Sequence, residues 1–216
     1  MAVTSAKEFL DLLEKSRLLG AEKLQEARAA AQEADNAVAL ARRLVEAGLL
    51  TDWQGAQLVA GRSSFLLGKY RLIRLLGRGG MGGVFLAEHT MMNRRVALKT
   101  ISRDFGSTPG SLEQFLLEAR TIAALDHPNI VQAYSFDQEG GRFFLVMEYI
   151  GGQDLEQIVE AQGPLEGSVA ADYIRQAAEG LQHGHERKII HCDIKPSNLL
   201  LNEQGVVKIV DMGMSR

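Results

Sequence analysis

The sequence predicts an α+β protein in which a small all-α module is followed by an antiparallel sheet with one embedded helix and then by a mostly helical part. Three observations indicate this order. Residues 1–62 hold 14 alanines but only four of the 22 glycines. From residue 70 onward, stretches rich in β-branched and aromatic residues are separated by glycine turns. After residue 151 the apolar residues return to helical spacing.

Composition excludes several classes of protein. The chain has 216 residues, with 24 Lys+Arg against 27 Asp+Glu, and its formal net charge of -3 argues against nucleic-acid binding. It has no run of about 18 apolar residues, so we expect no membrane segment in this chain. The single cysteine, Cys192, excludes an internal disulfide, and the N-terminus lacks the pattern of a signal peptide. These features predict a cytoplasmic protein.

Residues 1–62 predict a module of short amphipathic helices, joined to the rest by a linker at 63–69. The expected helices start near Ser5 (which can form a capping box with Glu8), at about residue 21, at Asp35 (ending at Gly48), and at Thr51 or Asp52. The module contains no catalytic constellation. We therefore predict a docking or regulatory role for it, through a separate partner or within the chain.

Residues 70–216 predict a sheet-rich part over about 70–150 and a partial helical part over about 151–216. Strands are expected over about 71–76, 84–89, 95–101, 130–136, 143–148, 199–201 and 206–209. Helices are expected over about 112–125, with Ser111 and Gln114 as a capping pair, and over about 168–187. The pair Gly151-Gly152 predicts a loop between the two parts.

The first chemical motif is glycine-rich and reads Gly77-Arg78-Gly79-Gly80-Met81-Gly82-Gly83-Val84. Glycines at this density let the backbone approach a phosphate and turn its N–H groups toward it. A dinucleotide-binding turn would require a helix directly afterwards, but residues 84–88 have the pattern of a strand. The motif therefore predicts a flap between two strands, with an ordinary glycine-rich hairpin as the alternative.

A lysine and a glutamate form the second candidate pair. Lys99 ends the strand-like run Val96-Ala97-Leu98-Lys99, and a lysine in an apolar strand must reach water or an anion. Glu118 lies beside the apolar stripe of the expected helix over 112–125, three residues after Phe115. Each charge needs a partner, so we expect Lys99 and Glu118 to pair; a solvated position for each is the alternative.

The third motif combines two nearby loops. His191-Cys192-Asp193-Ile194-Lys195-Pro196-Ser197-Asn198 is followed by Val210-Asp211-Met212-Gly213. Asn198 and Asp211 supply oxygen ligands suited to Mg²⁺. Asp193 could accept a hydroxyl proton, with Lys195 neutralising a transferred phosphoryl group.

Taken in order, these motifs resemble those of the protein kinase superfamily, specifically the eukaryotic-like serine/threonine kinases of bacteria. The resemblance covers about Tyr70 to Arg216. It also includes the segment His127-Pro128-Asn129-Ile130-Val131 and the hinge-like Met147-Glu148-Tyr149-Ile150. It implies a kinase-like N-lobe at about 70–150, a partial C-lobe at about 151–216, and ATP-dependent phosphoryl transfer to Ser/Thr hydroxyls of proteins.

The resemblance also implies roles for single residues. Those expected in catalysis are Asp193 as the base, Lys195, and Lys99 paired with Glu118, while Asn198 and Asp211 would hold Mg²⁺. The glycine-rich loop would cover the phosphates of ATP. The remaining ATP contacts would come from Leu76 and Val84 above the adenine, Ala97 and Leu200 on either side of it, Met147 as gatekeeper, backbone groups of Glu148 and Ile150, and Asp154 at the ribose.

The sequence departs from the family pattern in three places. Cys192 replaces a common arginine, which makes activation by loop phosphorylation less expected, and Met212 replaces a phenylalanine. The sequence also stops three residues after Gly213, before an activation segment. We therefore expect a fragment of a longer kinase, in which Ile174, Leu181, Ile189 and Ile209 lack part of their packing. The alternative functions are a nucleotide-binding pseudokinase or scaffold, inactive alone, and a pure interaction module.

Overall fold

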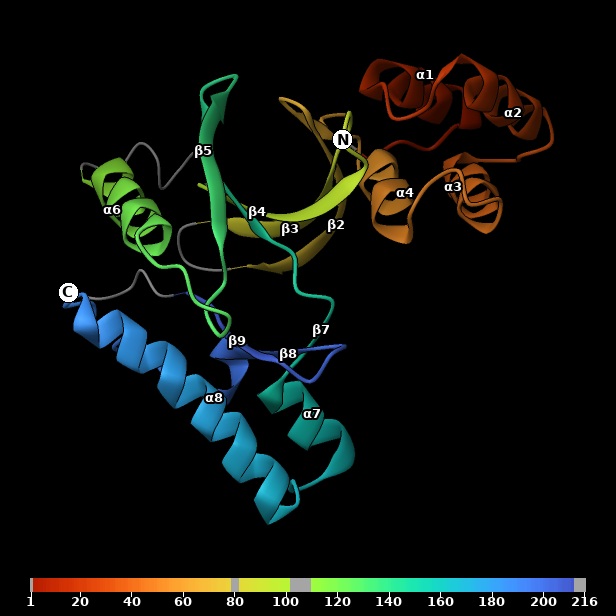
Figure 1. Ribbon diagram of the computed structural model, residues 1–216. Coiled ribbons are helices and arrows are strands. Elements are labelled where there is room, and N and C mark those ends of the chain that lie inside the picture. Colours follow the sequence, from red (N-terminus) through yellow and green to blue (C-terminus); the bar gives the residue numbers. More distant parts are fainter. Residues whose placement is uncertain (1, 79–81, 102–109, 212–216) are drawn as a thin grey trace. The chain divides into compact units, whose positions relative to one another are not determined.

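The computed structural model describes residues 2–78, 82–101 and 110–211 (Figure 1). The chain divides into two compact units, Met1–Val96 and Ala97–Arg216. Helices and antiparallel strands occur in both, which confirms the α+β class. Across the described ranges, no helix has both the length and the hydropathy that a membrane crossing requires.

The first unit begins with four helices, as the sequence predicts. They are α1 (Ala6–Ser16), α2 (Ala21–Gln32), α3 (Ala37–Glu46) and α4 (Asp52–Val59). The predicted capping box of Ser5 and Glu8 is present, and Thr51 caps α4. The predicted start of α3 at Asp35 is wrong by one residue, because Asn36 has the extended backbone of an N-cap and its side chain accepts from the N–H of Ala39 at 2.9 Å.

One hydrophobic core joins these helices. Phe9, Leu40, Leu44 and Leu58 are fully buried in it, and Phe65, from the expected linker, adds its ring. Burying a side chain of this size contributes about 1.5–3 kcal/mol, so these five residues contribute substantially to holding the short helices in place. The segment expected as a linker thus packs into the core and continues as strand β1 (Leu66–Leu67).

The strands of the first unit follow the order β1-β2-β3. After β1 come β2 (Tyr70–Arg78) and β3 (Gly83–His89), which pair antiparallel. Strand β4 (Arg94–Thr100) follows and runs from the first unit into the second. The register between β2 and β3 shifts between Leu72 and Arg74 and again between Leu75 and Gly77. These irregularities bend the strand that leads into the glycine-rich motif.

In the second unit, β4 is followed in the sheet by β6 (Arg142–Glu148) and β5 (Ala133–Glu139). Gly140 and Gly141 connect β5 to β6 with φ of 54° and 74°, the conformation of a tight hairpin turn. The predicted strand over 130–136 starts three residues too early, because Ile130 instead forms a parallel bridge with Ile209.

Helix α6 (Ser111–Ala123) packs against β5, with the rings of Phe115 and Phe136 5.6 Å apart. The predicted capping pair of Ser111 and Gln114 is wrong. Gly110 is the N-cap, in the left-handed conformation (φ 83°), and it has no side chain to accept a bond. Ser111 is instead the first helical residue and is buried.

The remaining elements form a small sheet and its helices. They are β7 (Gly152–Asp154), α7 (Leu155–Gln162), α8 (Gly167–Glu186), the short 3-10 helix η1 (Pro196–Asn198), β8 (Leu199–Asn202) and β9 (Val207–Ile209). The expected loop at Gly151-Gly152 is therefore half wrong, since Gly152 begins β7. A Cβ at Gly152 would lie 1.9 Å from the carbonyl oxygen of Leu201, so only glycine allows this pairing.

Helix α8 packs closely on β9. A Cβ built at Gly180 would lie 2.9 Å from Cδ1 of Ile209 and 3.1 Å from the carbonyl oxygen of Asn129. The expectation that Ile209 lacks packing is therefore wrong, and its side chain is fully buried. Ile174 does lie 59% exposed on α8.

We predict that Gly180→Ala destabilises the chain although alanine favours helix by about 0.5–1 kcal/mol. The added methyl would overpack the contact with β9, at a cost of about 1–3 kcal/mol. The control is Gly167→Ala in the first turn of α8, where the added Cβ would meet no described atom within 4 Å. Urea denaturation of both variants measures the difference. A Gly180→Ala variant as stable as Gly167→Ala would contradict the close packing.

Candidate functional site

The glycine-rich motif forms the end of the β2–β3 hairpin in the first unit. Gly77 pairs with Val84 and Arg78 with Gly83, so the motif starts and ends inside the ladder. Gly82 lies between the described strands, and Leu76 is 36% exposed on β2. The predicted residues Gly79, Gly80 and Met81 lie outside the described residues. The hairpin agrees with the expected strand–loop–strand flap.

Gly83 is confined by its neighbours. A Cβ at this position would lie 2.9 Å from Cε2 of Phe85 and 3.3 Å from Cδ1 of Leu75. A larger residue would therefore push the ring of Phe85 away. Crowding by these two side chains favours glycine here.

Three charged side chains meet in the second unit, as the expected pairing of Lys99 and Glu118 requires. Nζ of Lys99 lies 2.5 Å from Oε1 of Glu118 and 2.8 Å from Oδ1 of Asp211. Strand β4 supplies the lysine and helix α6 supplies the glutamate. Asp211 follows β9 and has a left-handed backbone (φ 58°), which aspartate tolerates better than most residues.

Because Lys99 and Glu118 are buried, each charge in this cluster depends strongly on the presence of the others. The side chain of Glu118 is 1% exposed and that of Lys99 is 14% exposed, whereas Asp211 is 44% exposed. Burial by itself would lower the pKa of Lys99, but the carboxylates of Asp211 and Glu118 outweigh it, so the pKa is raised. Removing one partner of a buried pair typically costs about 3–5 kcal/mol. Lys99 therefore carries a fixed positive charge at neutral pH.

The second group of predicted residues lies in the loop before β8. Nζ of Lys195 is 2.9 Å from Oδ2 of Asp193, and Nδ2 of Asn198 donates to the same oxygen at 3.1 Å and to the backbone oxygen of Asp193 at 2.8 Å. The hydrogen bond from Lys195 is the main cause that lowers the pKa of Asp193, and Asn198 adds to it. The same bond raises the pKa of Lys195. Asp193 is thus ionised and held at one oxygen.

His191 connects this loop to Asp211, a role that the sequence motifs did not suggest. Its side chain is 1% exposed. Nδ1 accepts the N–H of Asp193 at 3.2 Å, so the proton must sit on Nε2, which faces the carbonyl oxygen of Val210 at 2.9 Å. Val210 also donates its N–H to the carbonyl of Asn198 at 3.0 Å. A buried imidazole needs partners for both nitrogens, and His191 has them.

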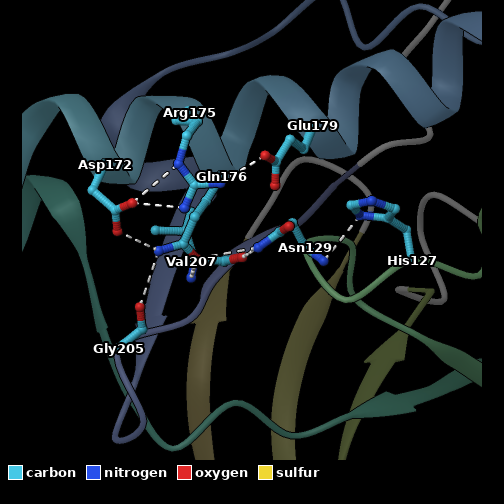
Figure 2. A network of polar contacts seen from close by, with 8 residues as sticks. All are labelled: His127, Asn129, Asp172, Arg175, Gln176, Glu179, Gly205 and Val207. Carbon is cyan, nitrogen blue, oxygen red and sulfur yellow. Dashed lines mark hydrogen bonds and ion pairs between the residues drawn. The ribbon is translucent and has the colours of Figure 1, made fainter.

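Strand β9, which leads to Asp211, is anchored to two segments by a polar network (Figure 2). Asn129 donates to the carbonyl of Val207 at 2.9 Å and to Oε1 of Gln176 at 3.2 Å, and Gln176 accepts the N–H of Val207 at 2.8 Å. The amide nitrogen of Gln176 donates to Asp172 and to the carbonyl of Gly205. The amides of Asn129 and Gln176 therefore hold the path of β9 against α8. Sequence reasoning missed Gln176, because its spacing on α8 resembles that of an exposed residue.

His127 starts the segment that this network holds. Its Nδ1 accepts the N–H of Asn129 at 3.1 Å, and its ring lies 5.0 Å from that of His183 (Figure 2 shows the first contact). Burial, and then the neighbouring His183, lowers the pKa of His127. The neutral ring thus serves as an acceptor at the turn before Asn129.

The other predicted site residues of the second unit differ in burial and in the partners of their side chains. Ala97, Met147 and Ile150 are buried, and Leu200 lies in β8 opposite Lys208. The side chain of Glu148 binds Nζ of Lys208 at 2.8 Å. Asp154 is the N-cap of α7, accepting the N–H of Gln157 at 2.8 Å, so its expected contact with a ribose would compete with this bond. Met212 and Gly213 lie outside the described residues.

Comparison with known proteins identifies the family. A family profile of the protein kinase domain matches residues 70–216. The serine/threonine-protein kinase PrkC of Bacillus subtilis is 36% identical over 148 residues, 68% of this chain and 23% of that protein. PknA of Mycobacterium tuberculosis is 38% identical over 156 residues, 70% of this chain and 36% of that protein. For pkn2 of Myxococcus xanthus the values are 35% over 162 residues, 74% and 19%.

The chain therefore spans between about a fifth and about a third of the length of these relatives. The matched range begins at Tyr70, where β2 starts, and it contains the lysine cluster and the Asp193 loop. Three bacterial serine/threonine kinases at this level of identity agree with the resemblance found in the motifs. The chain belongs to the protein kinase family and resembles its bacterial serine/threonine members.

Proposed function

We propose that this chain transfers the terminal phosphoryl group of ATP to Ser/Thr hydroxyls of proteins, with Mg²⁺ as the cofactor. The observation that carries the proposal is Lys99, held between Glu118 and Asp211 at 2.5 and 2.8 Å. A buried lysine fixed by two acids from different elements has a charge and a position suited to a phosphate. The three relatives, all serine/threonine-protein kinases by name, support the same activity.

The residues present fit ATP. An ammonium group has three N–H donors, and the two carboxylates take two of those of Lys99, which leaves one for a phosphate oxygen. The backbone of the glycine-rich motif would cover the phosphates, with Leu76 and Val84 toward the adenine. Ala97, Leu200 and Met147 would line the adenine, and backbone groups of Glu148 and Ile150 would bind its edge. These assignments rest on the proposed function.

The chemistry of Asn198 and Asp211 fits Mg²⁺. The amide nitrogen of Asn198 is used by Asp193, so the amide oxygen is the atom left to bind a cation. Asp211 gives one oxygen to Lys99, and its second oxygen could bind the same ion. When bound, the ion would neutralise phosphate charge. The bond from the N–H of Val210 to the carbonyl of Asn198 would keep the two ligands together.

Asp193 would act as the catalytic base. Lys195 and Asn198 both bind its Oδ2, which leaves Oδ1 to accept the proton of a substrate hydroxyl. Lys195 would then balance the charge on the transferred group. Asp193 is 37% exposed at its side chain, so a protein substrate could reach it. A supply of ATP and the lone exposed Cys192 agree with a cytoplasmic location, which is also part of the proposal.

We predict that Lys99→Met lowers phosphoryl transfer by at least about 100-fold, because it removes the positioned charge. Transfer of radiolabelled phosphate from ATP to a generic protein substrate measures it. The control is Arg175→Met, since Arg175 also bridges two carboxylates, Asp172 and Glu179, but on the exposed side of α8. That variant should keep its activity, because exposed ion pairs contribute little.

Three results of this experiment have different meanings. Loss in Lys99→Met with activity in Arg175→Met supports the kinase. Wild-type transfer that survives Lys99→Met contradicts it. Binding of Mg-ATP by the wild-type chain without any transfer would favour the alternative, a nucleotide-binding scaffold.

We predict that Lys195→Met raises the pKa of Asp193. The hydrogen bond from Lys195 favours the ionised carboxylate and is the main cause of the lowered pKa, so its loss moves the pKa back toward the ordinary value of about 3.9. Any stability that this bond gives is present above the unfolded pKa and is lost as the pH falls through the lower folded pKa. Carbon-detected NMR titration of the Asp193 carboxyl carbon in the wild type and the variant measures the change. Equal titration curves would show that Lys195 does not hold Asp193.

A further inference from the structure

Part of the N-terminal helical module lies along the edge of strand β2. Strand β1 covers this edge at Tyr70 and Arg71, and the N–H of Leu72 donates to the carbonyl of Phe65 at 2.8 Å. Beyond that point two side chains of the α4 region take the place of a strand. Gln54 Nε2 donates to the carbonyl of Leu72 at 2.8 Å, and Thr51 Oγ1 donates to the carbonyl of Ile73 at 2.7 Å.

These bonds occur where β2 is irregular. The register with β3 shifts between Leu72 and Arg74, so Ile73 is the extra residue of a bulge. A bulged strand leaves backbone groups without ladder partners, and buried carbonyls need them. Thr51 and Gln54 satisfy two consecutive carbonyls. The path of β2 toward the glycine-rich motif is thus set in part by α4.

Gln54 is built into both elements. It is 5% exposed, and its Oε1 accepts the N–H of Thr51 at 3.0 Å in the capping box of α4. Its amide nitrogen is therefore the group directed to β2. The side chain of Gln54 thus caps the first turn of α4 and also binds β2.

A second contact leads from α4 to the glycine-rich motif. The ring of Trp53 lies 5.8 Å from that of Phe65 and 5.8 Å from that of Phe85, edge-on in both cases. Phe85 in turn lies against Gly83, where an added Cβ would be 2.9 Å from its ring. Trp53 therefore limits the positions that Phe85 can take, and Phe85 borders the glycine that ends the motif.

The buried face of α4 that carries Gln54 also belongs to the helical core. Gly55 lies against Val45 and Ala41, where an added Cβ would come within 3.3 and 3.6 Å of their side chains, and Leu58 is fully buried. The helix thus joins the core of the module to the hairpin through two sets of residues. Thr51 and Gln54 direct their side-chain hydrogen bonds to β2, whereas the ring of Trp53 also packs against this core.

We propose that α4 positions the strands of the β2–β3 hairpin, and that Gln54 and Trp53 are positioning residues through which the helical module sets the affinity of the chain for Mg-ATP. The affinity part rests on the proposed function. Neither residue touches the nucleotide in this proposal. Each acts by holding the β2–β3 hairpin in the shape that covers the phosphates.

The test uses the complete chain with Gln54→Glu. Glutamate keeps the oxygen that caps α4 but has no N–H to donate to Leu72. The matched control is Gln57→Glu, the same change on the same helix, where the side-chain oxygen accepts from Arg62 and can still do so. Thr51→Ser keeps the hydroxyl donor and serves as the conservative variant. Thermal unfolding of these three variants, and of the Trp53→Leu variant used below, establishes that they are folded.

Hydrogen exchange without nucleotide is the first measurement. In Gln54→Glu, amides of residues 72–78 and 82–86 should exchange about tenfold faster than in Gln57→Glu, because the hairpin edge loses a bond. Amides of α1 and α3 should be unchanged, and Thr51→Ser should match the wild type. Equal exchange in the two glutamate variants would overturn the proposal.

Calorimetric titration with Mg-ATP is the second measurement. The dissociation constant should rise about threefold to tenfold in Gln54→Glu and in Trp53→Leu, the cost of ordering a loosened loop, and stay at the wild-type value in Gln57→Glu. Faster exchange with unchanged affinity would also overturn the proposal. A wild-type chain that binds no Mg-ATP would instead contradict the proposed function, and the exchange result would still decide whether α4 holds the hairpin.

Discussion

The buried lysine cluster is the constraint on which the second unit depends. Lys99 and Glu118 are both withdrawn from water, and each would be costly to bury alone. Their contact is possible only if β4 and α6 are placed at one distance, and the ring contact of Phe115 with Phe136 holds α6 against β5 of the same sheet. Asp211 joins them from a third direction, at the end of β9. One charge thus requires three separate segments to be placed correctly.

The backbone beside this cluster is held mainly by amides and an imidazole. Asn129 and Gln176 bind β9 on one side, and His191 binds the carbonyl of Val210 just before Asp211. Each of these side chains makes at least two hydrogen bonds, and such connected bonds strengthen one another. The result is that Asn198 and Asp211 are held near each other by one backbone hydrogen bond, from Val210 to Asn198, although they lie far apart in the sequence.

In the first unit, the shape of the glycine-rich hairpin is held by contacts from another part of the chain. A glycine-rich hairpin has few side chains with which to fix its own shape, and its strand β2 is bulged. Support comes from residues outside the family match, which starts at Tyr70. Thr51, Trp53 and Gln54 supply two hydrogen bonds and a ring contact to that hairpin. Through these contacts the helical module packs directly against the hairpin.

Much of this protein could be predicted from its sequence. Apolar spacing, caps and glycine turns indicated the helices and strands, and the order of Lys99, Glu118, Asp193 and Asp211 indicated the family. These signals depend on neighbouring residues or on the order of motifs along the chain, so they can be recognised from the sequence alone. The bridge between Ile130 and Ile209, the fit at Gly180 and the bonds of His191 and Gln54 could not be predicted, because each joins residues far apart in the chain. The sequence determined which elements form and which chemistry they carry; only the tertiary structure decided which buried polar groups become partners, since that depends on distances across the fold.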